Sequence, residues 1–144
     1  MQEIIDYQNF FIKKNISEYN LTETGKKIIK DHKKKGLKNE KHKYEYTIYY
    51  NDVYIGGIDG FVEYNTMKIE NLYIQKEFRN NKLGTKLINL IKEHGKFFQC
   101  KTCFIEILDI DLSNFFSKLG FNIIFQMNNY PQGRIRYFMQ MGLY

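Results

Sequence analysis

The sequence contains no tryptophan, a single proline and no long run of apolar residues. A transmembrane helix needs roughly 20 consecutive, predominantly apolar residues, so we expect no such span and no membrane partner. The first residues, MQEIIDYQNFFIKKN, carry acidic side chains early and lack the basic-then-apolar order of a secretion signal. These absences together predict a cytoplasmic protein.

Cysteine is also scarce, and Cys100 and Cys103 form a lone C-x-x-C motif. A zinc site would need two further ligands, and the three histidines are scattered along the chain. The motif also lacks the strand-then-helix setting of a thioredoxin-like redox site. We therefore expect two reduced thiols on a strand and no metal, with a redox or metal role as the alternative.

Arginine is rare as well, with three residues against 19 lysines, and the basic charge is confined to one segment. Residues 26–43 hold nine lysines against Asp31 and Glu40, a net charge of +7, whereas the whole chain carries +6. A solvated helix and loop explains this segment, and a patch that attracts acidic partners is the alternative. No RNA-binding motif and no interleaved aromatic residues accompany it, which argues against nucleic-acid binding.

Apolar and aromatic residues, in contrast, are abundant. Hydrophobic residues make up 43% of the 144, with 12 Phe and 12 Tyr. Such a chain can bury a core and is not typical of disordered proteins. Its length fits one domain, residues 1–144.

Periodicity and turn residues predict one strand, two helices, three strands, a helix, a strand, a helix and two strands. Residues 44–50 alternate polar and apolar, and with 53–63 and 68–74 they predict an antiparallel meander. A helix is predicted from Gly84 to His94, ended by Gly95. The other predicted elements are the strands 2–5, 102–108, 121–127 and 136–141 and the helices 7–19, 23–35 and 111–119. This order indicates the α/β (α+β) class, with a mixed sheet and a parallel strand pair that flanks the central helix.

Residues 69–87, IENLYIQKEFRNNKLGTKL, run from a predicted strand through a polar loop into this central helix. The first amides of a helix are unpaired and lie at the positive end of its dipole, so the junction suits a pyrophosphate. Gly84 lets the backbone approach such a ligand closely, and Arg79 can add a charge-assisted contact.

In this stretch the sequence resembles the GNAT superfamily of N-acetyltransferases, whose acetyl-CoA loop reads Arg/Gln-x-x-Gly-x-Gly/Ala after a strand. Arg79 and Gly84 occupy matching positions, and Lys82 replaces the first glycine. Residues 109–121, DIDLSNFFSKLGF, resemble a second block of the superfamily. Residues 130–143, YPQGRIRYFMQMGL, are similar to the closing hairpin of its small bacterial members.

The resemblance implies a mostly antiparallel sheet with flanking helices and a splayed parallel strand pair. It implies transfer of an acetyl group from acetyl-CoA to a primary amine of a small molecule or protein, directly within a ternary complex. The backbone amide near Leu72 would polarise the thioester carbonyl. Glu70 shares strand parity with Leu72, so we expect it to relay the proton of the amine, with an ordinary exposed glutamate as the alternative. The implied cofactor-binding residues are Leu72, Tyr73, Ile74, Arg79, Asn80, Asn81, Lys82, Leu83, Gly84, Thr85, Asp109 and Phe116.

Besides Lys82, two residues depart from the pattern of the superfamily. Phe116 stands where a tyrosine usually protonates the departing thiolate, and a phenylalanine can only pack there. Asp109 stands where asparagine is common. An acyl-CoA-binding protein with impaired catalysis is therefore the alternative function. The sequence identifies neither the acceptor nor the oligomeric state, although assembly of two copies through the closing strands remains open.

Overall fold

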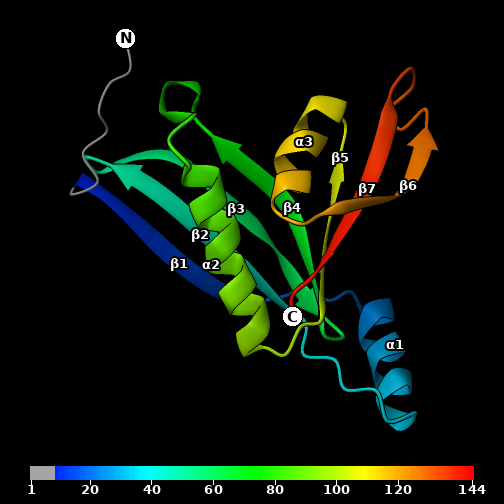
Figure 1. Cartoon of the computed structure of the whole chain (residues 1–144). Coiled ribbons are helices and arrows are strands. Elements are labelled where there is room, and N and C mark those ends of the chain that lie inside the picture. Colours follow the sequence, from blue (N-terminus) through cyan, green and yellow to red (C-terminus); the bar gives the residue numbers. More distant parts are fainter. Residues whose placement is uncertain (1–8) are drawn as a thin grey trace.

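A computed structural model describes residues 9–144 of the chain, which form one seven-stranded sheet with three α-helices (Figure 1). Along the sheet the strands follow the order β1-β2-β3-β4-β5-β7-β6. The elements are β1 (Phe10–Glu18), α1 (Glu23–Lys34), β2 (His42–Tyr50), β3 (Val53–Glu63), β4 (Thr66–Ile74), the 3₁₀ turn η2 (Lys76–Phe78), α2 (Leu83–Phe97), β5 (Thr102–Ile107), α3 (Ile110–Lys118), β6 (Asn122–Asn128) and β7 (Ile135–Gly142). The strand predicted at 2–5 lies outside the described residues.

The helix predicted at residues 7–19 is wrong. Residues 10–18 form the strand β1, which pairs antiparallel with β2 from Phe10 opposite Tyr50 to Glu18 opposite His42. Phe10 and Ile12 pack against the core, while the rest of the strand is exposed. A run of apolar residues followed by polar ones fits a helix face and an edge strand equally well, because an edge strand buries few side chains.

The antiparallel meander is confirmed. Alternate residues of β2, namely Tyr44, Tyr46 and Ile48, are buried, as the pattern predicted. The turn after β2 uses Asn51 and Asp52, both with positive φ, which suits a two-residue hairpin turn. The next turn uses Tyr64 and Asn65, both with positive φ, and β4 begins at Thr66, two residues before the predicted start at 68.

The single parallel pair of the described sheet, β4 with β5, is short. It extends only from Thr66 opposite Thr102 to Ile69 opposite Ile105. Beyond Ile69 the β5-facing edge of β4 has no strand partner among the described residues, so the two strands diverge. The predicted fold class, with its splayed parallel pair, is confirmed.

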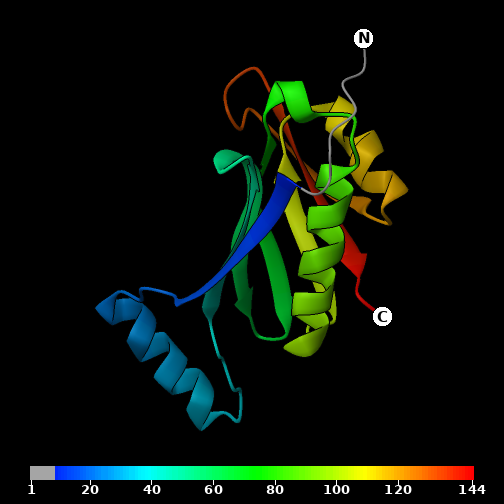
Figure 2. The same cartoon turned by 90° about the vertical axis from the view of Figure 1, so that its left-hand side faces the viewer.

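The helix α2 lies on one face of the sheet together with α3, whereas α1 lies beyond the end of the sheet (Figure 2). α2 buries Leu87, Ile88 and Ile91 in the core. Its predicted end at Gly95 is wrong, since the helix continues to Phe97. A Cβ at residue 95 would lie 2.8 Å from Leu143 Cδ1, so close packing accounts for this glycine.

Cys100 and Cys103 are free and buried, as predicted, with Cys103 on β5 and Cys100 just before it. Burial raises the pKa of the Cys100 thiol to about 11 and that of Cys103 to about 12. Both therefore stay protonated and unreactive near neutral pH. Among the described residues no helix is long and apolar enough to cross a membrane.

Candidate functional site

The divergence of β4 and β5 opens a cleft of about 980 Å³ between the ends of these strands, the start of α2 and the helix α3. Of the thirteen predicted site residues, all but Asn81 line it. Those that do are Glu70, Leu72, Tyr73, Ile74, Arg79, Asn80, Lys82, Leu83, Gly84, Thr85, Asp109 and Phe116. Residues far apart in sequence thus meet where the loop motif predicted a ligand.

The loop before α2 is shaped by two residues in the left-handed region, Asn80 (φ 66°) and Lys82 (φ 61°). Lys82 is the N-cap of α2, and its side chain makes no capping hydrogen bond to the helix. The left-handed conformation explains why glycine suits this position, and a lysine adopts it at a cost of about 1–2 kcal/mol. The first turn contains no acidic residue, so its dipole and amides are suited to an anion.

Arg79 and Asn81 hold the loop in place. Arg79 Nε donates a 2.7 Å hydrogen bond to the carbonyl of Ile74, which ties the loop to the end of β4. Asn81 Nδ2 donates to the carbonyls of Phe78 (3.1 Å) and Arg79 (3.0 Å). Asn81 is therefore better explained by loop geometry than by contact with a ligand.

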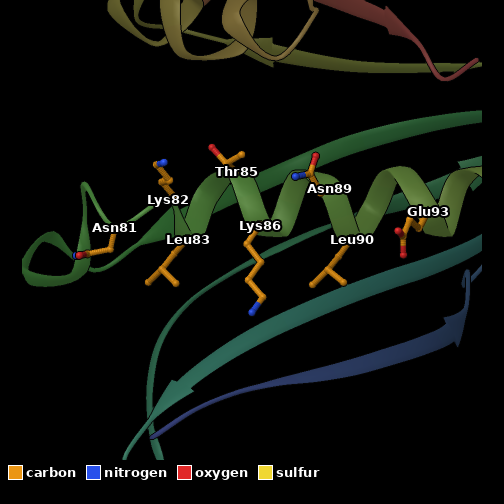
Figure 3. A pocket seen from close by; sticks show the side chains of 8 residues that line it. All are labelled: Asn81, Lys82, Leu83, Thr85, Lys86, Asn89, Leu90 and Glu93. Atoms are coloured by element: carbon orange, nitrogen blue, oxygen red, sulfur yellow. The ribbon is translucent and has the colours of Figure 1, made fainter. Parts of the chain in front are cut away.

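Asn81 lines a second, shallower cavity of about 340 Å³ that follows α2 as far as Glu93. Figure 3 shows Lys82 and Thr85 on one side of the helix, and Leu83 and Lys86 on the opposite side. Because Lys82, Leu83 and Thr85 line both cavities, the start of α2 separates them.

Glu70 lies at a β-bulge. β3 and β4 pair as Gly60 with Ile69 and Asp59 with Asn71, so Glu70 is an extra residue without a partner on β3. The bulge reverses the alternation: Met67 and Ile69 are buried before it, and Leu72 and Ile74 pack against the core after it. Simple strand parity was therefore the wrong reason for placing Glu70 in the cleft, although Glu70 is exposed and does line it.

The α3 side of the cleft is aromatic. Phe116 is 3% exposed and packs edge-on against Phe121, with ring centroids 5.4 Å apart. Its neighbour Phe115 covers the start of α2, where a Cβ at Gly84 would lie 3.2 Å from the ring. Asp109 is the N-cap of α3 and accepts a 2.9 Å hydrogen bond from the amide of Asp111. An N-cap role suits asparagine and aspartate alike, so the departure at this position is conservative.

The cleft is lined from both faces of the sheet. Ile105 and Ile107 of β5 are buried on the helix-covered face, whereas Glu106 between them points to the opposite face. There Glu106 is held by Lys68 Nζ (3.3 Å) and Arg136 Nη1 (3.2 Å). Arg136 also lies 3.8 Å from the centre of the Tyr130 ring, so the closing hairpin is fixed to β5.

Sequence reasoning missed eight lining residues: Asn71, Phe78, Ile105, Glu106, Ile107, Leu108, Leu112 and Phe115. The sequence predicted the parallel strand pair next to the loop, so the C-terminal end of β5 could have identified Ile105 to Leu108 as lining residues. Asn71 enters the lining through the bulge, and the sequence contains no recognisable pattern for that bulge. No residue of 26–43 lines the cleft.

Comparison with known proteins gives a result that is consistent with this fold. A model of the acetyltransferase (GNAT) family matches residues 10–121. No curated protein matches the sequence.

Solved structures with a similar fold include an acetyltransferase from Bacillus cereus, at 16% identity over 86% of this chain and 95% of that chain (TM-score 0.69). A GNAT acetyltransferase from Elizabethkingia anophelis with acetyl-CoA bound has 17% identity over 93% and 98% (TM-score 0.67). The ribosomal-protein-S18-alanine N-acetyltransferase of Escherichia coli has 15% identity over 91% and 94% (TM-score 0.66). At these identities the likeness shows a shared fold.

Proposed function

Because the chain belongs to the acetyltransferase (GNAT) family, we propose that it transfers the acetyl group of acetyl-CoA to a primary amine within a ternary complex. The observation that carries this proposal is the cleft where β4 leaves β5, with the uncapped start of α2 at one end. The Elizabethkingia relative with the same fold binds acetyl-CoA, which supports the same co-substrate here.

The pyrophosphate of CoA would lie against the amides of Leu83, Gly84 and Thr85, where the helix dipole favours negative charge. Lys82 at the N-cap adds a cation beside this position. The pantetheine arm would follow the unpaired edge of β4 beyond Glu70. Phe115 and Phe116 supply an apolar wall for it.

In the reaction, the neutral amine attacks the thioester carbonyl carbon, the C–N bond forms, and the C–S bond breaks to release CoA thiolate. The amide near Leu72 would donate to the carbonyl oxygen as negative charge develops there. Glu70 would accept the proton of the amine through water, since it is exposed and borders the cleft. Holding amine and thioester together accounts for most of the acceleration, because effective molarities reach about 10⁵–10⁸ M.

The amine would enter from the face of the sheet that carries Glu106, opposite α2 and α3. On this face the lining residue Glu106 binds Lys68 and Arg136, and Arg136 lies against Tyr130 of the closing hairpin. The hairpin's similarity to small bacterial N-acetyltransferases supports a role in holding the acceptor.

Phe116 favours a second candidate function, that of an acyl-CoA-binding protein with little or no turnover. Its ring offers no proton to the leaving thiolate, although it lines the cleft. A thiol with a pKa near 8.5 is, however, a fair leaving group without a donated proton. We therefore rank transfer above mere binding.

The deciding experiment is a CoA-release assay with the full chain, acetyl-CoA and a panel of amines, run beside calorimetry of acetyl-CoA binding. Release of CoA that depends on one class of amine supports the transferase. Acetyl-CoA binding without release on the whole panel supports the binding protein, and the absence of binding contradicts both functions.

A further inference from the structure

Tyr44 carries a buried hydroxyl that the proposed mechanism does not use. The residue lies on β2 and is 1% exposed, and its hydroxyl donates a 2.7 Å hydrogen bond to the main-chain carbonyl of Lys68 on β4. Because β3 lies between β2 and β4, the ring crosses this strand to reach the carbonyl. A phenylalanine would fill the core without needing a hydrogen-bond partner, so the hydroxyl indicates a specific role for the contact with β4.

Gly60 on β3 provides the space for this crossing. It pairs with Tyr44 on one side and with Ile69 on the other. A Cβ at residue 60 would lie 2.6 Å from the Tyr44 hydroxyl oxygen and 1.8 Å from the carbonyl oxygen of Lys68. A glycine in a strand often marks such a close approach. The tyrosine, the glycine and the carbonyl are therefore three parts of one contact that joins three strands.

This contact lies directly before the bulge at Glu70. Ile69 is the last residue of β4 that pairs with β3 before the bulge, and it is also the last that pairs with β5. Glu70 pairs with neither strand, and pairing with β3 resumes at Asn71, whose Nδ2 donates a 3.0 Å hydrogen bond to Asp59. Since a bulge disrupts the hydrogen bonds between strands, the side-chain contacts of Tyr44 before it and of Asn71 after it hold this segment.

We propose that Tyr44 is a positioning residue that acts through Glu70: its hydrogen bond to Lys68 fixes the bulge, and the bulge presents the Glu70 carboxylate to the cleft. This role rests on the proposed function, in which Glu70 accepts the proton of the amine. Burial, with smaller effects of the nearby Cys103 and Asp59, raises the pKa of Tyr44 well above its ordinary value. The hydroxyl therefore stays protonated and remains a donor throughout the pH range of an assay.

The first test is Tyr44→Phe in the full chain, which removes the hydroxyl alone. With an amine that supports CoA release, kcat should fall roughly tenfold or more, because a misplacement of about 1 Å can cost about 100-fold in rate. The dissociation constant of acetyl-CoA should stay the same, since Tyr44 does not line the cleft. The matched control is Tyr46→Phe, on the same buried face of β2, whose hydroxyl lies 3.2 Å from Nδ1 of His94 and does not reach β4. It should leave kcat unchanged.

A second background separates positioning from a general loss of structure. In a Glu70→Gln chain the carboxylate is gone, so Tyr44→Phe should reduce kcat far less there than it does in wild type. A merely structural role would reduce kcat by the same factor in both backgrounds. Equal factors, or a wild-type kcat in Tyr44→Phe, would overturn the positioning role.

Hydrogen–deuterium exchange of residues 66–74 tests the bulge without turnover. Tyr44→Phe should speed exchange in this segment roughly fivefold or more, as expected for the loss of one hydrogen bond, whereas Tyr46→Phe should not. Circular dichroism checks that both variants remain folded. The absence of CoA release by wild type on the whole amine panel would contradict the proposed function. Unchanged exchange in Tyr44→Phe would overturn the positioning role, whatever the activity.

Discussion

In the proposed complex, Gly84 is the position where we expect the chain to come closest to the pyrophosphate. Replacing it with aspartate puts a carboxylate beside that group, and like charges about 6 Å apart oppose each other by roughly 3 kcal/mol at an effective dielectric constant near 20. We expect Gly84→Asp to weaken acetyl-CoA binding at least tenfold, measured by calorimetry. Gly84→Ala is the control, since its methyl group meets only the tip of Phe115 and should cost far less. Equal affinities of Gly84→Asp and wild type would contradict the site.

Phe116 stands where, in the proposed reaction, a general acid would protonate the leaving thiolate. A positioned general acid contributes on the order of 10²–10⁴ in rate, and a tyrosine at residue 116 would supply one if its hydroxyl reaches the sulfur. We expect measurable transfer by the natural chain and a higher kcat for Phe116→Tyr. Phe115→Tyr, on the adjacent ring at 5.1 Å, is the matched control and should not raise kcat. A gain in both variants would mean that the hydroxyl acts through solubility or packing.

His94 links stability to pH. Its ring is buried against Tyr46 and His42, with Nε2 2.9 Å from the His42 ring. Burial, together with the nearby charges of His42 and Lys14, lowers the pKa of His94 to about 4. Burial also lowers the pKa of His42.

Between pH 6.5 and about 4 the unfolded chain binds a proton at residue 94 that the folded chain does not. The free energy of unfolding should therefore fall as the pH drops through this window, by roughly 1–3 kcal/mol in total. Urea denaturation at several pH values measures this slope. His94→Gln should flatten it and His32→Gln should not; an unchanged slope in His94→Gln would rule out this origin.

At the scale of elements, α1 is well capped but barely packed. Thr22 caps its start by accepting a hydrogen bond from the amide of Gly25 (3.0 Å), and Gly36 ends it with φ +84°. It buries no residue, and His32 contacts Tyr64 at the β3–β4 turn. An isolated helix of 12 residues is marginal in water, so α1 depends on its caps and on the contact between His32 and Tyr64.

We therefore expect amide hydrogens of α1 to exchange at least roughly 100-fold faster than those in the middle of α2, whose Leu87, Ile88 and Ile91 are buried. Hydrogen–deuterium exchange with mass spectrometry measures both helices in one experiment. Comparable protection would show that α1 is covered by something outside the described chain.

The same elements show what a sequence can predict. The regular alternation of β2 and the paired turn residues Asn51 and Asp52 predicted the meander correctly, because both are local signals. β1 was mistaken for a helix, because its place at the edge depends on β2 rather than on its own residues. The bulge at Glu70 was not foreseen either. It is set by Gly60, where a Cβ would lie 1.8 Å from the carbonyl oxygen of Lys68 on the neighbouring strand.

At the scale of the whole molecule, charge is distributed unevenly. Residues 26–43 carry a net +7 and lie away from the cleft, while the remainder sums to −1. Such a field acts on diffusing ions over about 10 Å at 0.1 M salt. It should attract an acidic acceptor without altering the pyrophosphate contacts.

We expect the triple change of Lys33, Lys34 and Lys35 to glutamine to raise the KM for an acidic acceptor, more at low salt than at high salt. The dissociation constant of acetyl-CoA should stay the same. A control that changes Lys13, Lys96 and Lys118 to glutamine alters the net charge equally at scattered sites, and should change KM less. Equal KM values for the two triple variants and wild type would indicate that residues 26–43 are only a solvated surface.

The lining of the cleft from both faces of the sheet has a kinetic meaning for the proposed reaction. If acetyl-CoA binds on the helix-covered face and the amine on the opposite face, as proposed, neither reactant has to pass the other and neither has to bind first. Initial-rate plots should then intersect rather than run parallel, and CoA should compete with acetyl-CoA but not with the amine. In the proposed complex the sheet would keep the two reactants apart except in the gap where β4 diverges from β5, and they would meet there.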